Sequence, residues 1–398
     1  MSSGAERIPR TVWVLGGVSL FMDMSSELVH AVLPLYLTTV MGLSVLAVGV
    51  IEGLAEATAS MLKVVSGFVS DRFARRKPLA LLGYGLAALT KPVFPLADTA
   101  FGVVGARVVD RIGKGIRGAP RDAIVADVTP PSLRDAAFGL RQSLDTVGAF
   151  AGPLLAMFFL WLWAGDLRSV LWVATVPALI AVGLLAFGVR EPVVAAPAGR
   201  SARLQLAAIA RLPRAFWSLL ALTALFSLAR LSEAFLVLRA QELGFGVVWI
   251  PLVMVVMSVV YSLSSYPAGL LAARVGRRVL FGASLAALIA AATALALWPG
   301  SSGLWLGVAL WGLHMGLSQG GLSAAVAELA PAQARATAFG LFHFVTGVFQ
   351  LASGALGGWL WIKYGSSATF VSGACWAALA LLALAVWGRS AVHRDVGG

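Results

Sequence analysis

Ionisable side chains recur at helical spacing inside long apolar stretches of this chain. Asp23, Glu27 and His30 stand at i, i+4 and i+7, so they share one face of a helix. Glu52 and Glu56 share a face in the next apolar stretch. If these stretches cross a membrane, each ionisable group costs at least about 2.5 to 3.5 kcal/mol and needs a partner or a purpose. The chemistry that such carboxyl groups could perform is the uptake and release of protons.

The stretch from residue 101 to 126 is the densest in charge. One face of the predicted helix carries Asp110, Lys114, Arg117 and Arg121, and Arg107 and Arg111 lie beside this face. One interpretation is a polar cavity in which these cations act on carboxylates, and the other is a set of ion pairs with a structural role. We favour the structural role for four residues nearer the cytoplasmic ends of this stretch and of the stretch 136–162, namely Arg117, Arg121, Arg141 and Asp145. Both interpretations stay open for Arg107, Asp110 and Arg111.

Histidines beside carboxylates raise the question of a metal. His30 shares its face with Asp23 and Glu27, and His314 and His343 lie further along the chain, so these residues could bind a divalent ion. A histidine that faces a water-filled cavity without a metal is the interpretation we favour. Cys375 is the only cysteine, which excludes a disulfide and a thiolate metal site. We predict no resident metal or cofactor, and a proton gradient as the driving force.

Composition places the chain in a membrane. It has 398 residues, of which 59% are hydrophobic and 12% charged, whereas about a quarter of the residues of a soluble domain are charged. A membrane-spanning helix needs roughly 20 apolar residues. Twelve such runs predict an all-helical integral membrane protein, and they lie near 11–37, 45–66, 78–96, 101–126, 136–162, 169–189, 214–238, 247–271, 279–298, 303–327, 335–361 and 366–388.

The basic residues indicate how the chain is oriented. A formal net charge of +12 would suit a nucleic-acid partner, but the lysines and arginines gather at alternate ends of the apolar runs. Lys and Arg are retained on the cytoplasmic side of a membrane. Both termini and the loop that follows residue 67 are therefore predicted to be cytoplasmic. The predicted partners are the lipid bilayer and a small-molecule substrate, and nucleic acid is excluded.

An internal repeat divides the chain. The stretch GFVSDRFARRK at 67–77 returns in altered form as GLLAARVGRR at 269–278, and ADVTPPSLRDAAFGL at 126–140 returns as AELAPAQARATAFGL at 327–341. The first pair is 202 residues apart and the second 201, so one insertion or deletion separates the two frames. The even number of spans between the copies predicts a parallel repeat. The predicted parts are a six-helix half at 1–190, a cytoplasmic linker with an amphipathic helix at 191–213, and a second six-helix half at 214–398.

The repeated loop resembles a signature of the major facilitator superfamily. That family reads Gly-x-x-x-Asp-Arg-x-Gly-Arg-Arg between its second and third helices, and the matching residues here are Gly67, Asp71, Arg72, Arg75 and Arg76. In the second copy the matching basic residues are Arg274, Arg277 and Arg278, while Ala273 replaces the acid. The resemblance implies two pseudo-symmetric six-helix bundles and a cytoplasmic latch formed by these loops.

Two further segments are similar to motifs of that family. Arg107 and Gly113 match its Arg-x-x-Gln-Gly-x-Gly motif, which is linked to proton transfer, although Asp110, Arg111 and Lys114 depart from it. Gly148, Gly152 and Pro153 match the motif that its exporters and antiporters carry. The resemblance implies proton-coupled export and, as is usual in the family, a monomer.

The predicted function is therefore proton-coupled export, or antiport, of a small organic molecule by alternating access in the inner membrane of a prokaryote. One alternative is the export of a divalent metal or a metal chelate through Asp23, Glu27 and His30. Another is the transport of an anionic solute by the cations at 111, 114 and 117. An enzyme is not expected, although Ser318 stands in a Gly-x-Ser-x-Gly pattern typical of hydrolases.

Overall fold

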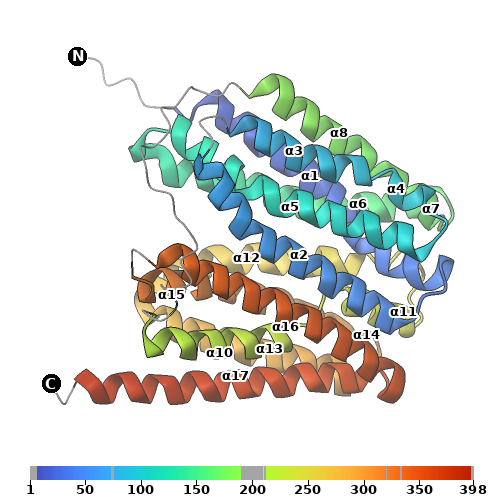
Figure 1. Ribbon diagram of the computed structural model, residues 1–398. Helices are drawn as coiled ribbons and strands as arrows, with labels where there is room; N and C mark the ends of the chain where they lie inside the picture. Colours follow the sequence, from blue (N-terminus) through green and yellow to red (C-terminus); the bar gives the residue numbers. More distant parts are fainter. Residues whose placement is uncertain are drawn as a thin grey trace. The chain divides into compact units, whose positions relative to one another are not determined.

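The described residues of the computed structural model form helices and no strand (Figure 1). The structure describes residues 7–72, 76–189, 209, 212–319, 321–331 and 334–395. Contacts between helices divide the chain into two compact units, a first unit of Met1–Tyr36 with Thr58–Ala202 and a second unit of Leu37–Ala57 with Arg203–Gly398. The predicted linker at 191–213 lies almost entirely outside the described residues, so the predicted boundaries of the two halves stay predictions.

The helices up to residue 188 follow the predicted apolar runs. They are α1 (Arg10–Leu35), the π-helical turn η1 (Tyr36–Val40), α2 (Val45–Arg72), α3 (Lys77–Thr90), α4 (Val93–Leu96), α5 (Ala100–Val128), the short 3₁₀ turn η2 (Pro131–Leu133), α6 (Arg134–Leu162), α7 (Leu167–Val173), α8 (Thr175–Gly183) and the π-helical turn η3 (Leu184–Gly188). Asp166 begins α7 by accepting the backbone N–H groups of Arg168 and Ser169. Hydrogen bonds from Ser169 lower the pKa of Asp166 below its usual value.

The helices from residue 214 onward belong to the second unit. They are α10 (Arg214–Ala229), α11 (Ala234–Glu242), α12 (Leu252–Val275), α13 (Arg277–Leu297), α14 (Gly300–Ser318), α15 (Gly321–Leu329), α16 (Arg335–Tyr364) and α17 (Ser366–Asp395). The first part of α2 belongs here as well, because a Cβ atom on Gly53 would lie 2.9 Å from the Cα atom of Leu351 on α16. A Cβ atom on Gly358 of α16 would likewise lie 2.6 Å from the Cα atom of Leu46.

Ten helical stretches of the described residues are long and apolar enough to cross a membrane. The predicted all-helical membrane protein is therefore confirmed for the part of the chain that the structure describes. α5 is not among the ten, since charged side chains interrupt its apolar sequence, and neither is α14. The count of twelve spans stays a prediction.

The span predicted at 214–238 is interrupted. α10 ends at Ala229, the backbone of Arg230 leaves the helical region at φ −84° and ψ 85°, and α11 begins at Ala234. The carbonyl oxygen of Leu228 beside this break accepts a hydrogen bond from the Ser353 hydroxyl of α16 at 3.0 Å. Because the donor comes from a distant part of the chain, local periodicity does not predict the break.

Glycines bring α1 and α6 into backbone contact in the first unit. A Cβ atom on Gly152 would lie 2.5 Å from the carbonyl oxygen of Met24 and 2.8 Å from the amide nitrogen of Leu28. One turn earlier, Gly148 lies against the backbone of Leu20 and Met24. The two residues that match the exporter motif therefore serve close helix packing, as small residues do in membranes.

A second close contact joins α3 to α5. A Cβ atom on Gly83 would lie 2.8 Å from both the carbonyl oxygen of Gly113 and the amide nitrogen of Arg117. Tyr84, the next residue, is fully buried in the core of the first unit. α5 therefore runs closely against α3 within the first unit (Figure 1).

Replacing Gly148 by alanine should destabilise the first unit. The added methyl group would meet backbone atoms of α1, which cannot move aside as a flexible side chain can, so we expect a loss of about 1 to 3 kcal/mol. Gly139→Ala on the same helix is the matched control, because nothing lies within 4 Å of its added Cβ atom. That change should instead stabilise the helix by about 0.5 to 1 kcal/mol. Thermal unfolding of the purified proteins in detergent measures both, and a Gly148→Ala protein as stable as the wild type would contradict the packing.

Candidate functional site

Asp110 on α5 is the centre of a buried charge cluster in the first unit. Its Oδ1 atom lies 2.8 Å from the Nζ atom of Lys91, and its Oδ2 atom lies 3.4 Å from Nε of Arg111 and 3.9 Å from Nη1 of Arg107. The side chains of Lys91 and Asp110 are 0% and 2% exposed. Three cations thus converge on one buried carboxylate. Asp110 and Arg111, the two residues here that differ from the family motif, both belong to this cluster.

Lys91 ties α3 to this cluster and was not among the predicted site residues. It directly follows the last residue of α3 and precedes Pro92, which lacks an N–H group. Its ammonium group donates to Asp110 and lies 3.4 Å from the hydroxyl of Ser26 on α1. A single lysine within an apolar run is the sequence signal that could have found it, because such a residue must have a partner inside the protein.

A second cluster links α1, α5 and α6. Arg117 Nη2 lies 3.4 Å from Asp23 Oδ1, and Arg121, one turn further along α5, places Nη1 3.7 Å from Asp145 Oδ1. Arg141 on α6 places Nη1 3.1 Å from the other carboxylate oxygen of Asp145. The four residues for which we favoured a structural role therefore lie in one cluster with the predicted proton carrier Asp23; they are Arg117, Arg121, Arg141 and Asp145.

Glu27 and His30 pair with each other one turn further along α1. The Nδ1 atom of His30 lies 3.5 Å from Glu27 Oε2. Lys114 on α5, which is half-buried, acts electrostatically on both Glu27 and Asp23. Within the described residues, no three His, Cys, Asp or Glu side chains come together as metal ligands. Of the three residues that share this face, Glu27 and His30 contact each other, whereas the carboxylate of Asp23 contacts Arg117.

The remaining predicted cavity residues lie in the second unit. Glu52 is buried on the first part of α2, and Glu56 follows it on the same helix. His314 on α14 is fully buried, and its Nδ1 atom lies 3.0 Å from the carbonyl oxygen and 2.9 Å from the hydroxyl of Ser284. His343 on α16 packs against the ring of Phe342, with 5.1 Å between the ring centroids. The predicted set is thus divided between the two units.

Ser318 shows no arrangement for nucleophilic attack. Its hydroxyl donates to the backbone carbonyl of Met315, 3.3 Å away, at the end of α14. His314, the nearest histidine in the sequence, bonds Ser284 instead. Gly316 and Ser318 of the Gly-x-Ser-x-Gly pattern lie in α14, and no strand precedes them among the described residues, whereas the hydrolase motif requires a strand-to-helix turn.

The repeated loops make equivalent ion pairs, one in each unit. Arg76 before α3 pairs with Asp127 near the end of α5, and Arg277 at the start of α13 pairs with Glu328 near the end of α15. Each arginine reaches an acid 51 residues further along the chain. The basic loop therefore binds an acidic helix end in both copies.

The residue after each of these arginines also has an equivalent place. Lys77 donates to the carbonyl oxygen of Ala186 at 2.8 Å, and Arg278 donates to that of Leu384 at 2.7 Å. Position 277 therefore corresponds to 76 and 278 to 77, an offset of 201. The one-residue shift between the two frames lies between residues 67 and 76, where the loop itself differs in length.

The other predicted latch residues have no described contacts of this kind. The side chains of Asp71 and Arg72 and the whole of Arg75 lie outside the described residues. Gly67 lies within α2 with open space around it, and Arg274 is exposed near the end of α12.

The break between α10 and α11 carries a further charged pair of the second unit. Arg230 Nη2 lies 3.2 Å from Glu233 Oε1, with the cation at the C-terminal end of α10 and the acid at the N-terminal end of α11. Each charge complements the dipole of the helix end that it adjoins.

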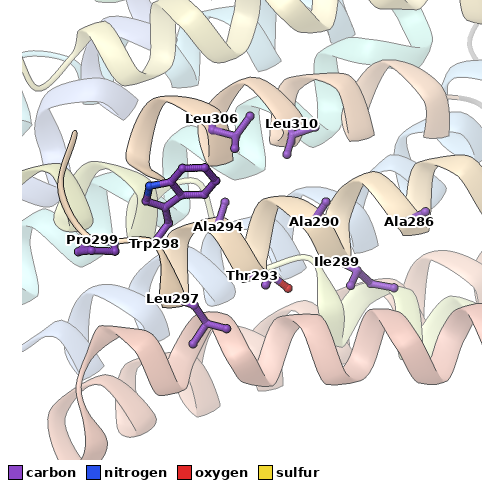
Figure 2. Close-up of a pocket in the computed structure, with 10 residues that line it drawn as sticks. All are labelled: Ala286, Ile289, Ala290, Thr293, Ala294, Leu297, Trp298, Pro299, Leu306 and Leu310. Carbon is purple, nitrogen blue, oxygen red and sulfur yellow. The ribbon is translucent and has the colours of Figure 1, made fainter. Parts of the chain in front are cut away.

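The pocket in Figure 2 is of a different kind. It lies on α13 and α14 of the second unit, and its lining side chains are apolar apart from Thr293. Trp298 and Pro299 lie at the C-terminal end of α13 there, and Leu306 and Leu310 face it from α14 (Figure 2). None of the ionisable residues described above lines it, so it offers no proton chemistry.

The sequence profile of the Major Facilitator Superfamily matches residues 15–348 and, in a second alignment, 234–397. The chain belongs to the major facilitator superfamily. An MFS-type transporter of Methanocaldococcus jannaschii is 30% identical over 381 residues, which cover 92% of this chain and 94% of the relative. Multidrug resistance protein MdtH of Yersinia enterocolitica is 27% identical over 143 residues, which cover 36% of this chain and 35% of that protein.

Solved structures agree on the fold of this family. The crystal structure of the nucleoside transporter NupG superposes with a TM-score of 0.73 and 15% sequence identity, covering 96% of this chain and 99% of that one. A likeness at this identity concerns the fold alone. Family and fold are those of multi-pass membrane transporters, and the clusters around Asp110 and Asp23 lie within such a transporter.

Replacing Asp110 by asparagine should destabilise the protein strongly. The change leaves three buried cations without the carboxylate on which they converge, and breaking a buried pair in this way costs about 3 to 5 kcal/mol. Asp98→Asn is the matched control, because the ion pair of Asp98 with Arg168 is exposed and screened by solvent. Thermal unfolding in detergent compares the two variants. Equal, small shifts would show that the Asp110 cluster does not stabilise the fold.

Proposed function

We propose that the chain exports a small organic molecule in exchange for protons by alternating access. The observation that carries this proposal is the placement of Asp23 beside the arginines of α5, inside a membrane transporter. A carboxyl group there can exist with or without a proton, and each state interacts differently with its cationic neighbours. A difference of this kind is what allows a ligand, here the proton, to shift a conformational equilibrium.

The contact between Asp23 and Arg117 gives the coupling a physical form. When Asp23 is ionised, it attracts the Arg117 guanidinium 3.4 Å away, and α1 is held to α5. When Asp23 takes up a proton, the charge that attracts Arg117 is lost and the two helices are less firmly joined. Glu27 and Lys114 lie next along the same two helices, so a proton on Glu27 would act in the same sense.

Two observations favour export. Gly148, Gly152 and Pro153 match the motif of the family's exporters and antiporters, and the two glycines form the contact between α1 and α6. MdtH, a relative over about a third of the chain, is named as a multidrug resistance protein. We further propose that the protein lies in the inner membrane of a prokaryote as a monomer, with both termini in the cytoplasm.

Transport of an anionic solute is the second candidate. Lys91, Arg107 and Arg111 converge on Asp110, and an anion that entered this cluster would compete with the carboxylate for the same cations. In this case the solute would carry a carboxylate or phosphate group, since arginine binds both through two parallel hydrogen bonds.

Neutral variants of the two α1 carboxylates test the first candidate. Asp23→Asn and Glu27→Gln keep the size of each side chain and remove its ability to exchange a proton. Everted membrane vesicles with an imposed pH gradient, loaded from outside with ethidium as a cationic probe or carboxyfluorescein as an anionic one, report transport. We expect both variants to lose gradient-driven uptake while they remain folded and inserted at wild-type levels.

The outcomes separate the candidates. Full activity in both variants would reject proton coupling through α1. Movement of carboxyfluorescein but not ethidium would favour the anionic solute. A growth screen of a deletion strain against antimicrobials, metals and siderophores then narrows the substrate.

A further inference from the structure

Asp23 on α1 and Asp145 on α6 face two arginines that lie one turn apart on α5. Arg117 Nη2 lies 3.4 Å from Asp23 Oδ1, and Arg121 Nη1 lies 3.7 Å from Asp145 Oδ1. A side-chain hydrogen bond joins the two carboxyl groups. Two ionised carboxylates only accept hydrogen bonds, so a bond between them requires a proton on one of the two. Two carboxylates that share a site commonly hold one proton between them, because the like charges repel when both are ionised. The contact is therefore a place where one proton can be bound.

The packing of α1 against α6 produces this contact. Gly148 lies against Leu20 and Met24, and Gly152 lies one turn further along both helices. The turn of α6 before Gly148 carries Asp145, and the corresponding turn of α1 carries Ser19. Arg121 bears out this register, because its Nη1 atom lies 3.0 Å from the Ser19 hydroxyl and 3.7 Å from Asp145 Oδ1. Asp23 stands one turn after Ser19 on the same face.

Charged groups from α5 and α6 surround the pair. From α5, Arg117 contacts Asp23, Arg121 contacts Asp145, and Lys114 acts on Asp23 at longer range. From α6, Arg141 contacts Asp145. Asp122 of α5, whose side chain is 43% exposed, lies 3.0 Å from Arg121 and 3.7 Å from Arg141.

We infer that Asp23 and Asp145 bind a single proton jointly and that this pair is the coupling site of the transporter. With the proton bound, the pair carries one negative charge. When the proton leaves to water, the pair carries two, and Arg117 and Arg121 hold α1 and α6 more firmly to α5. One proton is taken up on one side of the membrane and one is released on the other, and no other bond is made or broken.

This inference deepens the proposed function and rests on it. It assigns to Asp145 a direct part in proton binding, where the sequence favoured a structural role. Gly148 and Gly152 then have a second role, because the close contact of α1 with α6 that they allow brings the two carboxyl groups together.

Infrared difference spectroscopy of the purified protein, recorded between acidic and alkaline pH, tests the inference without a substrate. A protonated carboxyl group has a carbonyl band that an ionised one lacks. We expect the wild type to show such a band from the pair, and Asp23→Asn and Asp145→Asn each to remove the whole of it. Asp122→Asn is the matched control, an identical change in the same cluster that leaves the band in place.

Other results would overturn the inference. Loss of the band in Asp23→Asn but not in Asp145→Asn would show that Asp23 binds the proton alone, and the proposed function would stand. A band that survives in both variants, or no band in the wild type, would reject the shared proton. Size-exclusion profiles identify a variant that fails to fold. If Asp145→Asn fails, Asp145→Glu serves instead: its longer side chain changes the geometry of the pair and should shift the frequency of the band, and an unchanged band would reject the shared proton.

Transport adds a readout that a purely structural Asp145 would not move. The pH profile of probe uptake into everted vesicles should flatten in Asp145→Asn as it does in Asp23→Asn, and Asp145→Glu should restore the dependence on pH. A normal profile in Asp145→Asn with a flat one in Asp23→Asn would contradict the inference alone. Normal profiles in both variants would contradict the proposed function as well.

Discussion

The cost of burying charge in an apolar environment governs the first unit. α5 carries arginines, a lysine and aspartates on turn after turn, and a membrane offers them no water. The helices packed around α5 supply the compensation, with Asp23 from α1, Asp145 from α6, and Lys91 from the end of α3 completing the Asp110 cluster. Charge compensation therefore fixes how these helices are rotated about their own axes.

Glycine contacts and ion pairs in this unit depend on each other. α5 approaches α3 closely because Gly83 and Gly113 have no side chains in the way, and α1 approaches α6 at Gly148 and Gly152. The ion pair of 2.8 Å between Lys91, at the end of α3, and Asp110 on α5 needs such an approach. Binding of a proton to one of the carboxylates of this unit removes its negative charge and so weakens ion pairs that join separate helices.

Hydropathy and helical spacing can be evaluated within one segment of the sequence. These local properties predicted an all-helical membrane protein, its family and most of the ionisable residues of the two clusters, although not Lys91. The repeat also predicted that Asp127 and Glu328 are equivalent, and both bind the basic loop of their own unit. Pairings across helices were not predictable in this way. Asp145 and Lys91 have partners on other helices, and these contacts depend on how each helix is rotated about its axis. At the break near Arg230, the Ser353 hydroxyl from a distant helix donates a hydrogen bond to the carbonyl oxygen of Leu228.

The central claim is that protons reach and bind the buried carboxylates of the first unit. Proteoliposomes on a solid-supported membrane allow a direct measurement, because charge that enters the protein after a pH step produces a transient current without any substrate. The account predicts a transient current in the wild type and none in Asp23→Asn at equal protein density. An equal current from Asp23→Asn, or no current from the wild type, would contradict it.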